Sequence, residues 1–297
     1  MSNKLRKMTL EKKHNLTGWA FLAPATFLIA VFSFWPMIKA LVLSFQTGKG
    51  RNMQMAGFTN YIRMFQDDVF IQSIKNTFFY FILQVPIMLV VALVLACILN
   101  KKDLRFKGFF RTMIFLPCTT SLVAYSIIFR SLFANDGLVN YVLVNLGILD
   151  KPYNFLTQPF AAKMVIILAL LWRWTGYNMV FFLSGLQNIE YSVYEAAKID
   201  GASAIQTFFK ITVPLLKPTI LLTAIMSTNG TLQLFDESVN LTDGGPANAS
   251  ISMSHYIYNL CFKYVPNFGY AAAMSFFILL LVAVLAFIQM RVGDKRD

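Results

Sequence analysis

Residues 192–214 of the chain read SVYEAAKIDGASAIQTFFKITVP, a polar stretch between two long apolar segments. Ser192 and Glu195 have the S-x-x-E spacing of a capping box, which predicts the start of a short helix. Two alanines, which are strong helix formers, come next, and Gly201 stands where that helix would end. A second short helix is expected from Ala202 toward the closing proline. An ordered, capped connection of this kind indicates a segment on which another molecule docks.

The composition places the chain in a membrane. Of its 297 residues, 57% are hydrophobic and 15% are aromatic, and the mean hydropathy is +0.58, unlike a soluble globular domain. A helix needs about 20 largely apolar residues to cross a bilayer. The segments of this kind are Trp19–Phe45, Ile74–Leu99, Thr112–Phe133, Ala161–Leu186, Thr219–Phe235 and Tyr270–Met290. We therefore predict an all-α integral membrane protein with six transmembrane helices.

The distribution of Lys and Arg predicts the orientation of these crossings, because basic residues accumulate in short cytoplasmic segments. More than half of the 26 basic residues lie at the two ends of the chain, in the second-to-third connection and around Glu195. In the opposite connections, acidic residues balance the basic ones. We therefore expect both termini in the cytoplasm. The expected parts are a cytoplasmic segment at 1–18, a transmembrane domain at 19–290 with the polar loop at 188–214, and a cytoplasmic tail at 291–297.

The net charge of +12 does not indicate a nucleic-acid partner. The excess is spread along the membrane edges and forms no folded basic face, so anionic lipid headgroups are the expected counterpart. The three cysteines do not form the pattern of a disulfide framework. His14 and His255 are too far apart in the sequence to predict a metal site, so no metal is expected.

The polar stretch resembles the EAA loop of the membrane subunits of binding-protein-dependent ABC importers. That loop has Glu-Ala-Ala, a Gly four residues after the last Ala, and then Ile and Pro after fixed gaps, and Val213 here replaces the usual Leu. The matching positions are Glu195, Ala196, Ala197, Gly201, Ile211 and Pro214. The resemblance extends over residues 19–290 in layout and implies the fold of a type I ABC importer permease.

Three further motifs resemble the maltose and multiple-sugar branch of the same permease family. They are LTDGGP at 241–246, YIYN at 256–259 and GYAAAMS at 269–275. Independently of any resemblance, Gly-Gly-Pro forces a tight turn and interrupts a helix. The resemblance implies import of a sugar or oligosaccharide across a bacterial cytoplasmic membrane.

The resemblance also implies what the loop does. It would form coupling helices in a groove of a cytoplasmic ATPase, where Glu195 would face a basic residue and Asp200 would belong to the same surface. A rigid capped helix transmits a displacement that a flexible loop would absorb. In the simpler interpretation, Glu195 only completes the capping box and Asp200 caps the following turn.

The chain has no G-x-x-x-x-G-K-[ST] phosphate loop, so ATP hydrolysis is expected on another polypeptide, and this chain is expected to hold no cofactor and to be no enzyme. The resemblance implies four kinds of neighbour. They are a second homologous permease, two ATPase subunits that bind ATP and Mg, an extracytoplasmic sugar-binding protein, and membrane lipid.

Polar and aromatic residues within two crossings predict a substrate path, because polar groups in a bilayer are costly and usually face a cavity or another helix. The residues are Arg173, Trp174, Tyr177 and Asn178 in the fourth crossing, and Asn229, Thr231, Gln233 and Asp236 in the fifth. The spacing of the first four favours one face of the fourth crossing, and the spacing of Asn229, Gln233 and Asp236 favours one face of the fifth, with Thr231 nearby. A sugar needs aromatic surfaces for its C–H groups and polar groups for its hydroxyls. The alternative is hydrogen bonding between helices, worth about 0.6 kcal/mol per contact.

Arg173 is the residue of this set with the strongest reason to have a function, since a guanidinium in mid-span is costly. We expect it to pair with Asp236 or Glu237, or to select an acidic substrate. An ion-coupled secondary transporter is the alternative to the ABC permease, but it requires intramembrane carboxylates and inverted repeats. The Asp and Glu residues here lie outside the predicted crossings or at their edges. A membrane enzyme is disfavoured because no cluster of His, Cys or carboxylates forms a reacting centre.

Overall fold

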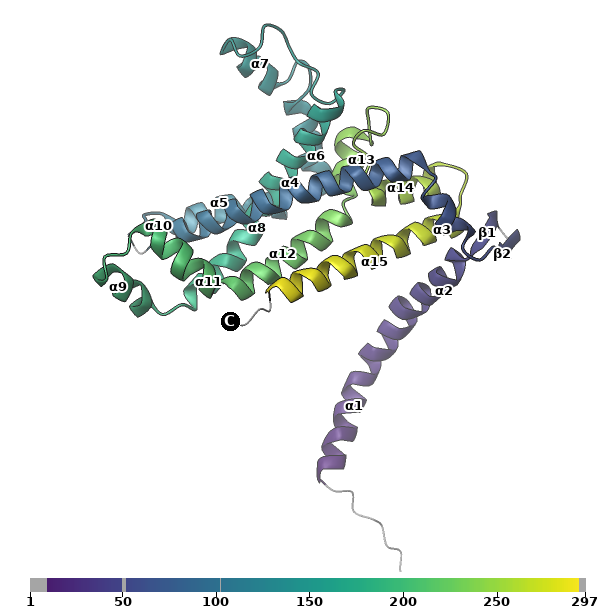
Figure 1. Ribbon diagram of the computed structural model, residues 1–297, viewed down its shortest axis with the longest axis horizontal. Coiled ribbons are helices and arrows are strands. Elements are labelled where there is room, and N and C mark those ends of the chain that lie inside the picture. Colours follow the sequence, from purple (N-terminus) through teal and green to yellow (C-terminus); the bar gives the residue numbers. More distant parts are fainter. Residues whose placement is uncertain (1–9, 50–51, 102, 294–297) are drawn as a thin grey trace, which may run out of the picture.

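The computed structural model describes residues 10–49, 52–101 and 103–293, and the chain is mostly helical over these ranges (Figure 1). The extreme ends of the predicted cytoplasmic segments, residues 1–9 and 294–297, lie outside the described residues. The elements, with π-helical segments labelled η, are α1 (Leu10–Ile29), η1 (Ala30–Phe34), α2 (Trp35–Ser44), β1 (Gln46–Lys49), β2 (Asn52–Met55), α3 (Thr59–Met64), α4 (Asp68–Leu99), α5 (Lys107–Thr119), α6 (Leu122–Leu132), α7 (Leu138–Asn145), α8 (Pro159–Gln187), α9 (Tyr191–Ile199), α10 (Ala204–Thr207), η2 (Phe208–Thr212), α11 (Val213–Leu215), α12 (Lys217–Leu232), α13 (Asp236–Thr242), α14 (Met253–Tyr258), η3 (Asn259–Lys263) and α15 (Phe268–Gly293).

Among the described residues, four stretches of helix are long and apolar enough to cross a membrane, namely His14–Ser44, α4, α8 and α15. Two further crossings are bent pairs within the described chain: α5 and α6 meet at 98°, and the helix ending at Leu215 meets α12 at 71°. Counting each bent pair as one crossing gives the six that the sequence predicts.

The third predicted crossing, Thr112–Phe133, is therefore not one continuous helix. Pro117 lies in the last turn of α5, and Thr120 and Ser121 take extended conformations before α6 begins. A proline removes the helix hydrogen bond to the residue four positions before it, and the break follows Pro117 by three residues. Pro86, by contrast, lies inside the unbroken α4, so proline alone does not decide where a helix ends.

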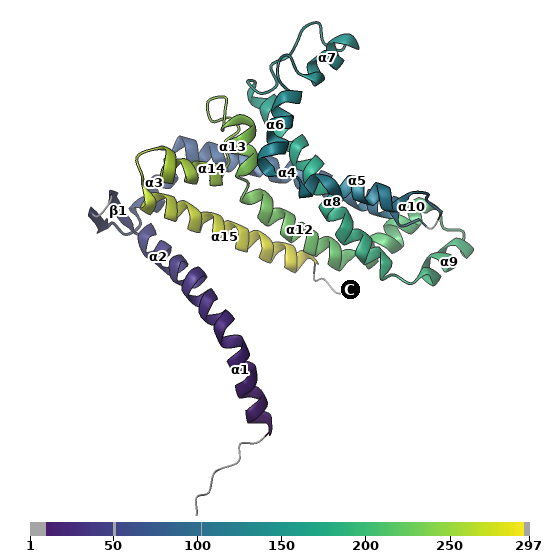
Figure 2. The same ribbon diagram turned by 180° about the vertical axis from the view of Figure 1, so that it is seen from behind.

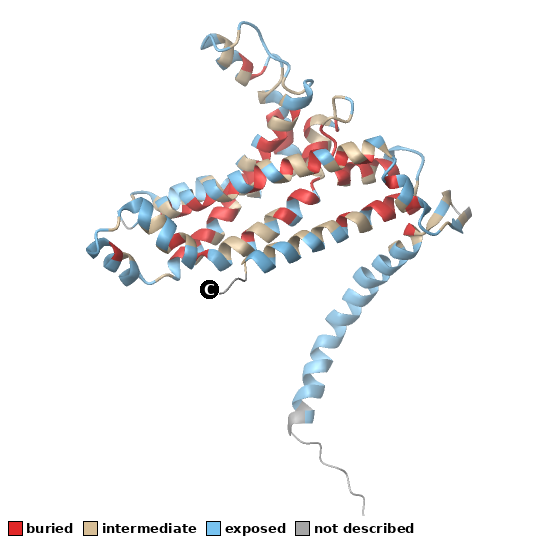
Figure 3. Ribbon diagram, viewed as in Figure 1, coloured by how far each residue is buried: buried red, intermediate tan, exposed pale blue. Residues whose placement is uncertain are grey.

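The bundle is built around α4 and α8, which pack along each other, with α5 against α8 and with α12 between α4 and α15. Gly176 on α8 makes the contact with α5 possible. A Cβ atom at this glycine would lie only 1.9 Å from the carbonyl oxygen of Ile114, so the two backbones touch directly. The buried residues form three clusters along the length of the bundle, and they lie on the facing sides of these helices (Figure 3).

The two ends of the bundle carry different elements (Figures 1 and 2). At one end α4 and α8 finish, α5 and α12 begin, and the short helix α9 projects, with the end of α15 on the same side. The hairpin β1–β2, α3 and α14 lie toward the opposite end, and α6 and α7 extend away from the bundle. The connections toward this opposite end contain short helices, namely α7, α13, α14 and η3.

The first crossing stands apart from the rest of the chain. Its apolar window within His14–Ser44 is not buried at all, and α1 diverges from the bundle in both views (Figures 1 and 2). Trp19, Phe21 and Phe32 are 69%, 82% and 73% exposed. Only the end of this crossing is attached, since α2 packs against the start of α15. The crossing thus leaves a long apolar face uncovered within the described chain.

Asp67 fastens three helices at the end that carries the hairpin. Its Oδ1 accepts hydrogen bonds from the backbone N–H groups of Val69 (3.0 Å) and Phe70 (3.1 Å), which caps α4. Its Oδ2 accepts hydrogen bonds from the hydroxyls of Tyr256 on α14 and Tyr270 on α15, both at 2.7 Å. One carboxylate therefore satisfies the first turn of α4 and holds it against two other helices.

Candidate functional site

The connection between α8 and α12 contains the short elements α9, α10, η2 and α11, in agreement with the ordered loop that the sequence predicts. The predicted capping box at Ser192 and Glu195 is wrong, because α9 begins one residue before Ser192, and Glu190 takes the extended N-cap conformation. Ser192 lies inside the helix and donates to the Glu190 carboxylate at 3.3 Å. A capping box is present further on, where Ser203 and Gln206 bond reciprocally at the start of α10. Asp200 is the C-cap of α9 and does not cap the next turn.

The end of α9 at Gly201 agrees with the sequence prediction. Gly201 has a φ of +76°, its N–H donates to Lys198 (3.2 Å), and the N–H of Ala202 donates to Ala197 (2.9 Å). This pair of hydrogen bonds is the Schellman motif, and its left-handed residue favours glycine. Together with the Ser203 capping box, it fixes the path of the chain between the two short helices.

The side chains of this loop divide into buried and exposed sets. Ala197 is buried, while Glu195, Ala196, Asp200 and Pro214 are exposed and Ile211 is half-buried. Large apolar side chains also face outward: Ile199 is 85%, Ile205 is 72% and Phe209 is 65% exposed. Phe208, in contrast to Phe209, packs against the bundle.

A second candidate site is a cavity of about 360 Å³ among α4, α8, α12 and α13. Seven of the residues that the sequence indicates for a substrate path line it, namely Arg173, Trp174, Tyr177, Asn178, Thr231, Gln233 and Asp236. Asn229 is not part of the lining; its side-chain oxygen accepts a hydrogen bond from Gln233. The rings of Trp174 and Tyr177 meet edge to face at 5.8 Å.

The lining also contains residues that sequence reasoning did not assign to the path, among them Gln84 and Met88 on α4, and Glu237 on α13. The Thr231 hydroxyl donates to the side-chain oxygen Oε1 of Gln84 at 2.9 Å, and the Ser227 hydroxyl donates to the side-chain oxygen Oδ1 of Asn178 at 3.2 Å. A glutamine in the middle of an apolar crossing was the available signal for Gln84. Its partner on α12 is 147 positions away, so no local spacing reveals the pair.

Asp236 reaches the cavity from a different helix than expected. The helix α12 ends at Leu232, and Gln233 is its C-cap, so Asp236 is the first residue of α13 and does not continue the face of α12. The cause is Phe235, whose φ of −132° takes the backbone out of the helical region. Of the residues expected to share one face of the fifth crossing, only Asn229 and Gln233 therefore do so.

The expected ion pair of Arg173 with Asp236 or Glu237 does not form within the described ranges, where the recorded ion pairs involve other residues. Arg173 instead donates from Nη1 to the backbone carbonyl of Thr120 at 2.9 Å. Glu237, which is 4% exposed, accepts a hydrogen bond from the Tyr125 hydroxyl at 2.5 Å.

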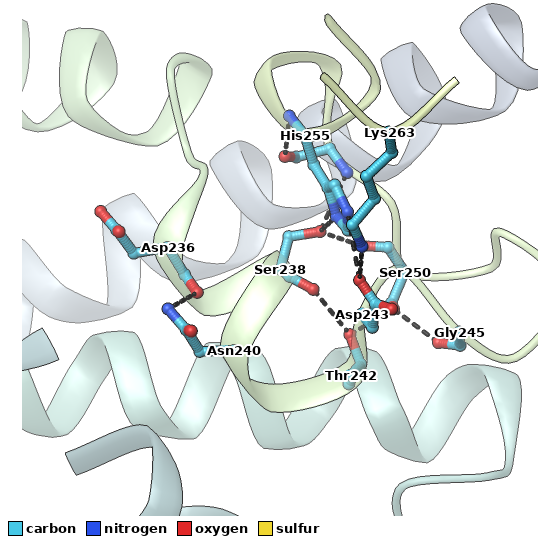
Figure 4. Close-up of polar contacts among 10 residues, drawn as sticks. Asp236, Ser238, Asn240, Thr242, Asp243, Gly245, Ser250, His255 and Lys263 are labelled. Carbon is cyan, nitrogen blue, oxygen red and sulfur yellow. Dashed lines mark hydrogen bonds and ion pairs between the residues drawn. The ribbon is translucent and has the colours of Figure 1, made fainter. Parts of the chain in front are cut away.

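The predicted Gly-Gly-Pro turn at 241–246 is held by hydroxyl groups (Figure 4). The Ser250 hydroxyl donates to the carbonyl of Gly245 at 2.5 Å and lies 2.7 Å from the Thr242 hydroxyl. Gly244 has a φ of +76°, and a Cβ atom there would come within 3.2 Å of Ile251, so both backbone and space favour glycine. The turn is therefore a fixed surface feature.

His255 lies fully buried beneath this turn (Figure 4). Its Nδ1 is 2.9 Å from the Ser238 hydroxyl, and its Nε2 is 3.6 Å from the Asp243 carboxylate, which Lys263 contacts at 2.7 Å. Burial lowers the pKa of His255 to about 4; Asp243 opposes this shift, and Lys263 adds to it. The imidazole is therefore neutral at neutral pH.

The helical bundle, the bent crossings and the polar cavity define a membrane transport subunit. The family of binding-protein-dependent transport system inner membrane components matches residues 68–296. The chain belongs to this family, and it is therefore a permease subunit of an ABC importer and not itself an enzyme.

Curated relatives and solved structures agree with this assignment. The lactose transport system permease protein LacF of Rhizobium radiobacter is 52% identical over 98% of both chains. The multiple sugar-binding transport system permease protein MsmF of Streptococcus mutans is 33% identical over 97% of this chain and 99% of that one. These relatives confirm the resemblance to sugar ABC permeases, and they give no support to an ion-coupled secondary transporter.

A crystal structure of a bacterial ABC transporter involved in the import of the acidic polysaccharide alginate has the same fold. Its chain superimposes with a TM-score of 0.84 at 24% identity, covering 97% of this chain and 98% of that one. A second structure, of a bacterial alginate ABC transporter in complex with alginate pentasaccharide-bound periplasmic protein, gives a TM-score of 0.83 at 25% identity, with 96% of each chain covered.

Proposed function

We propose that this chain imports a sugar by alternating access and that the cavity among α4, α8, α12 and α13 forms its part of the path. The observation that carries the proposal is the lining of that cavity. Trp174 and Tyr177 provide aromatic surfaces for the C–H faces of a sugar, and Asn178, Gln233 and Asp236 provide amide and carboxylate groups for its hydroxyls. A volume of about 360 Å³ is within the range of small-molecule sites.

The loop between α8 and α12 couples this path to ATP hydrolysis. The Schellman end at Gly201 and the capping box at Ser203 support the proposal, because they make the loop stiff enough to transmit a displacement. The exposed side chains of Ile199 and Ile205 suit a protein interface. The coupling residues are Glu195, Ala196, Ala197, Asp200, Gly201, Ile211 and Pro214.

The assembly contains several further subunits. A second homologous permease covers the apolar face of the first crossing and completes the path, and two ATPase subunits, which bind ATP and Mg, dock on the loop. An extracytoplasmic sugar-binding protein docks at the opposite end, a proposal supported by the periplasmic protein present in the alginate transporter complex. Anionic lipid headgroups contact the basic membrane edges.

The same assembly implies an orientation of this chain in the membrane. Residues 1–18 and 291–297 are cytoplasmic, residues 19–290 form the membrane domain, and the coupling loop at 188–214 lies on the cytoplasmic side of the bacterial membrane. Lys198, Lys210 and Lys217 on or beside that loop support this orientation.

Uptake by the complete importer in proteoliposomes tests the proposal, with lactose as the probe. Trp174→Ala should raise the KM for lactose about tenfold, the loss expected for one aromatic stacking surface. Trp172→Ala on the same helix removes an indole that does not line the cavity, and it should leave the KM unchanged. Equal KM values for the two variants would exclude the cavity as the path. Uptake that persists with an inactive ATPase would exclude the ABC mechanism.

A further inference from the structure

The break in the third crossing lies against α8. The helix α5 ends at Thr119 and α6 begins at Leu122, and the two helices meet at 98°. The last carbonyl groups of a helix have no partner within the helix and need one from elsewhere. The carbonyl of Thr120, at the break itself, receives the Nη1–H of Arg173 at 2.9 Å.

Arg173 belongs to the lining of the cavity, but its guanidinium is held by contacts with the break and with two aromatic rings. The residue is only 6% exposed, and its guanidinium carbon lies 4.8 Å from the ring centre of Tyr125 and 5.4 Å from that of Trp174. Its Nε is buried and has no hydrogen-bond partner in the part of the chain that the structure describes. A guanidinium held in this way supports the backbone at the break and has one donor free for a different acceptor.

The contacts continue from the break to α13. Tyr125, on the first turn of α6, donates its hydroxyl hydrogen bond to Glu237, and α6 packs on α13. The helix α5 has a different neighbour, since it packs along α8 at the glycine contact of Gly176, one turn beyond Arg173. The two halves of the third crossing thus pack mainly on different helices, although α6 also contacts Trp172 of α8, and Arg173 lies at the joint between them.

We propose that the break in the third crossing is a hinge of the transport cycle and that Arg173 is the positioning residue that fixes its bend. The assignment rests on the proposed sugar import, but it gives Arg173 a role distinct from contact with the sugar. Movement of α6 with α13 changes the wall of the cavity, because Leu122 and Glu237 both line it. A short break between two rigidly packed halves is a structure that absorbs such a rotation.

Distances between spin labels test the hinge directly. The labels are placed at the exposed positions Phe109 on α5 and Ile127 on α6, in the complete importer with the three cysteines of this chain replaced by alanine. In the otherwise unchanged protein, we expect one label distance without nucleotide and a different one after trapping with ATP and vanadate. In Arg173→Gln, both distance distributions should broaden.

Lactose uptake by the same preparations separates positioning from sugar binding. Arg173→Gln should lower the maximal rate about tenfold, the effect expected for one charge-assisted hydrogen bond, with the KM within about twofold of the original. Arg173→Lys, which retains the charge and a donor, should recover part of the rate. Trp174→Ala should instead raise the KM and leave both label distances sharp.

The possible outcomes distinguish the two proposals. Equal label distances in the two states would show that the break is static and would overturn the hinge. A raised KM with unchanged distances in Arg173→Gln would place the arginine on the sugar. If Arg173→Gln does not assemble, the same comparisons are made on Arg173→Lys, in which sharp distances and a normal rate would equally overturn the inference. An importer that changes its label distances but carries no sugar would refute the proposed function alone.

Discussion

The substitution Gly201→Ala tests whether the stiffness of the coupling loop matters for transport. Gly201 has a φ of +76°, and a Cβ atom added there meets nothing within 4 Å. The cost of the substitution is therefore purely conformational, about 1–2 kcal/mol for an L-residue in the left-handed region. That energy corresponds to a factor of about 5–30 in the ratio of formed to frayed helix end.

Hydrogen exchange measures this change in the loop itself. The amides of residues 200–202, which bond back into α9, should exchange about 5–30 times faster in Gly201→Ala than in the unchanged protein. ATP-driven uptake should fall because a frayed lever absorbs part of the displacement, while ATP hydrolysis continues. The result is a lower number of sugars imported per ATP.

Gly147 provides a matched control. It ends α7 with the same pair of hydrogen bonds, has a φ of +68°, and also has open space around its Cβ position. Gly147→Ala should loosen the end of α7 to a similar extent and leave the sugar-to-ATP ratio unchanged. Unchanged exchange in Gly201→Ala would refute the conformational argument, and faster exchange with normal coupling would refute the lever.

Three further substitutions test the packing and the polar contacts. Gly176→Ala should destabilise the purified complex by about 1–3 kcal/mol, since its Cβ atom would overlap the backbone of α5; Gly108→Ala, in open space, should leave the melting temperature unchanged. Asp67→Asn should lower the free energy of unfolding by about 1–3 kcal/mol, because it weakens the hydrogen bonds from two tyrosine hydroxyls and the N-cap of α4. Asp68→Asn should lower this free energy much less in the same thermal unfolding measurement. Burial lowers the pKa of His255 to about 4, so the folded protein loses stability as the pH falls from about 6.5, the ordinary pKa of histidine, toward 4. Hydrogen exchange of the α14 amides should accelerate over that pH window. The substitution His255→Gln should abolish this pH dependence.

The sequence predicts the long helices and the capped loop because their signals are local. The length of the apolar segments predicts the crossings, and the glycine at position 201 predicts a residue in the left-handed conformation there. The start of α9 is less determined, since Glu190 and Ser192 are two residues apart and only the backbone decides which of them takes the extended N-cap conformation. The bend after Pro117 shows the same limit, because a proline predicts weakness at a position but no angle.

The arrangement of the cavity depends on contacts that no spacing encodes. Arg173 bonds to a backbone carbonyl, and every residue offers such a group, so Thr120 could not be identified as its partner from the sequence. Gln84 meets Thr231 only because α4 and α12 pack together. The break at Phe235, which moves Asp236 onto another helix, arises from the tertiary structure, since the helical spacing continues through it in the sequence.

The detached first crossing separates two stages in the maturation of this subunit. The later helices bury one another and can reach their final arrangement within a single chain, whereas α1 and η1 can gain a fixed direction only from an external surface. In a newly inserted copy, lipid alone would therefore surround this helix until another subunit packs against it.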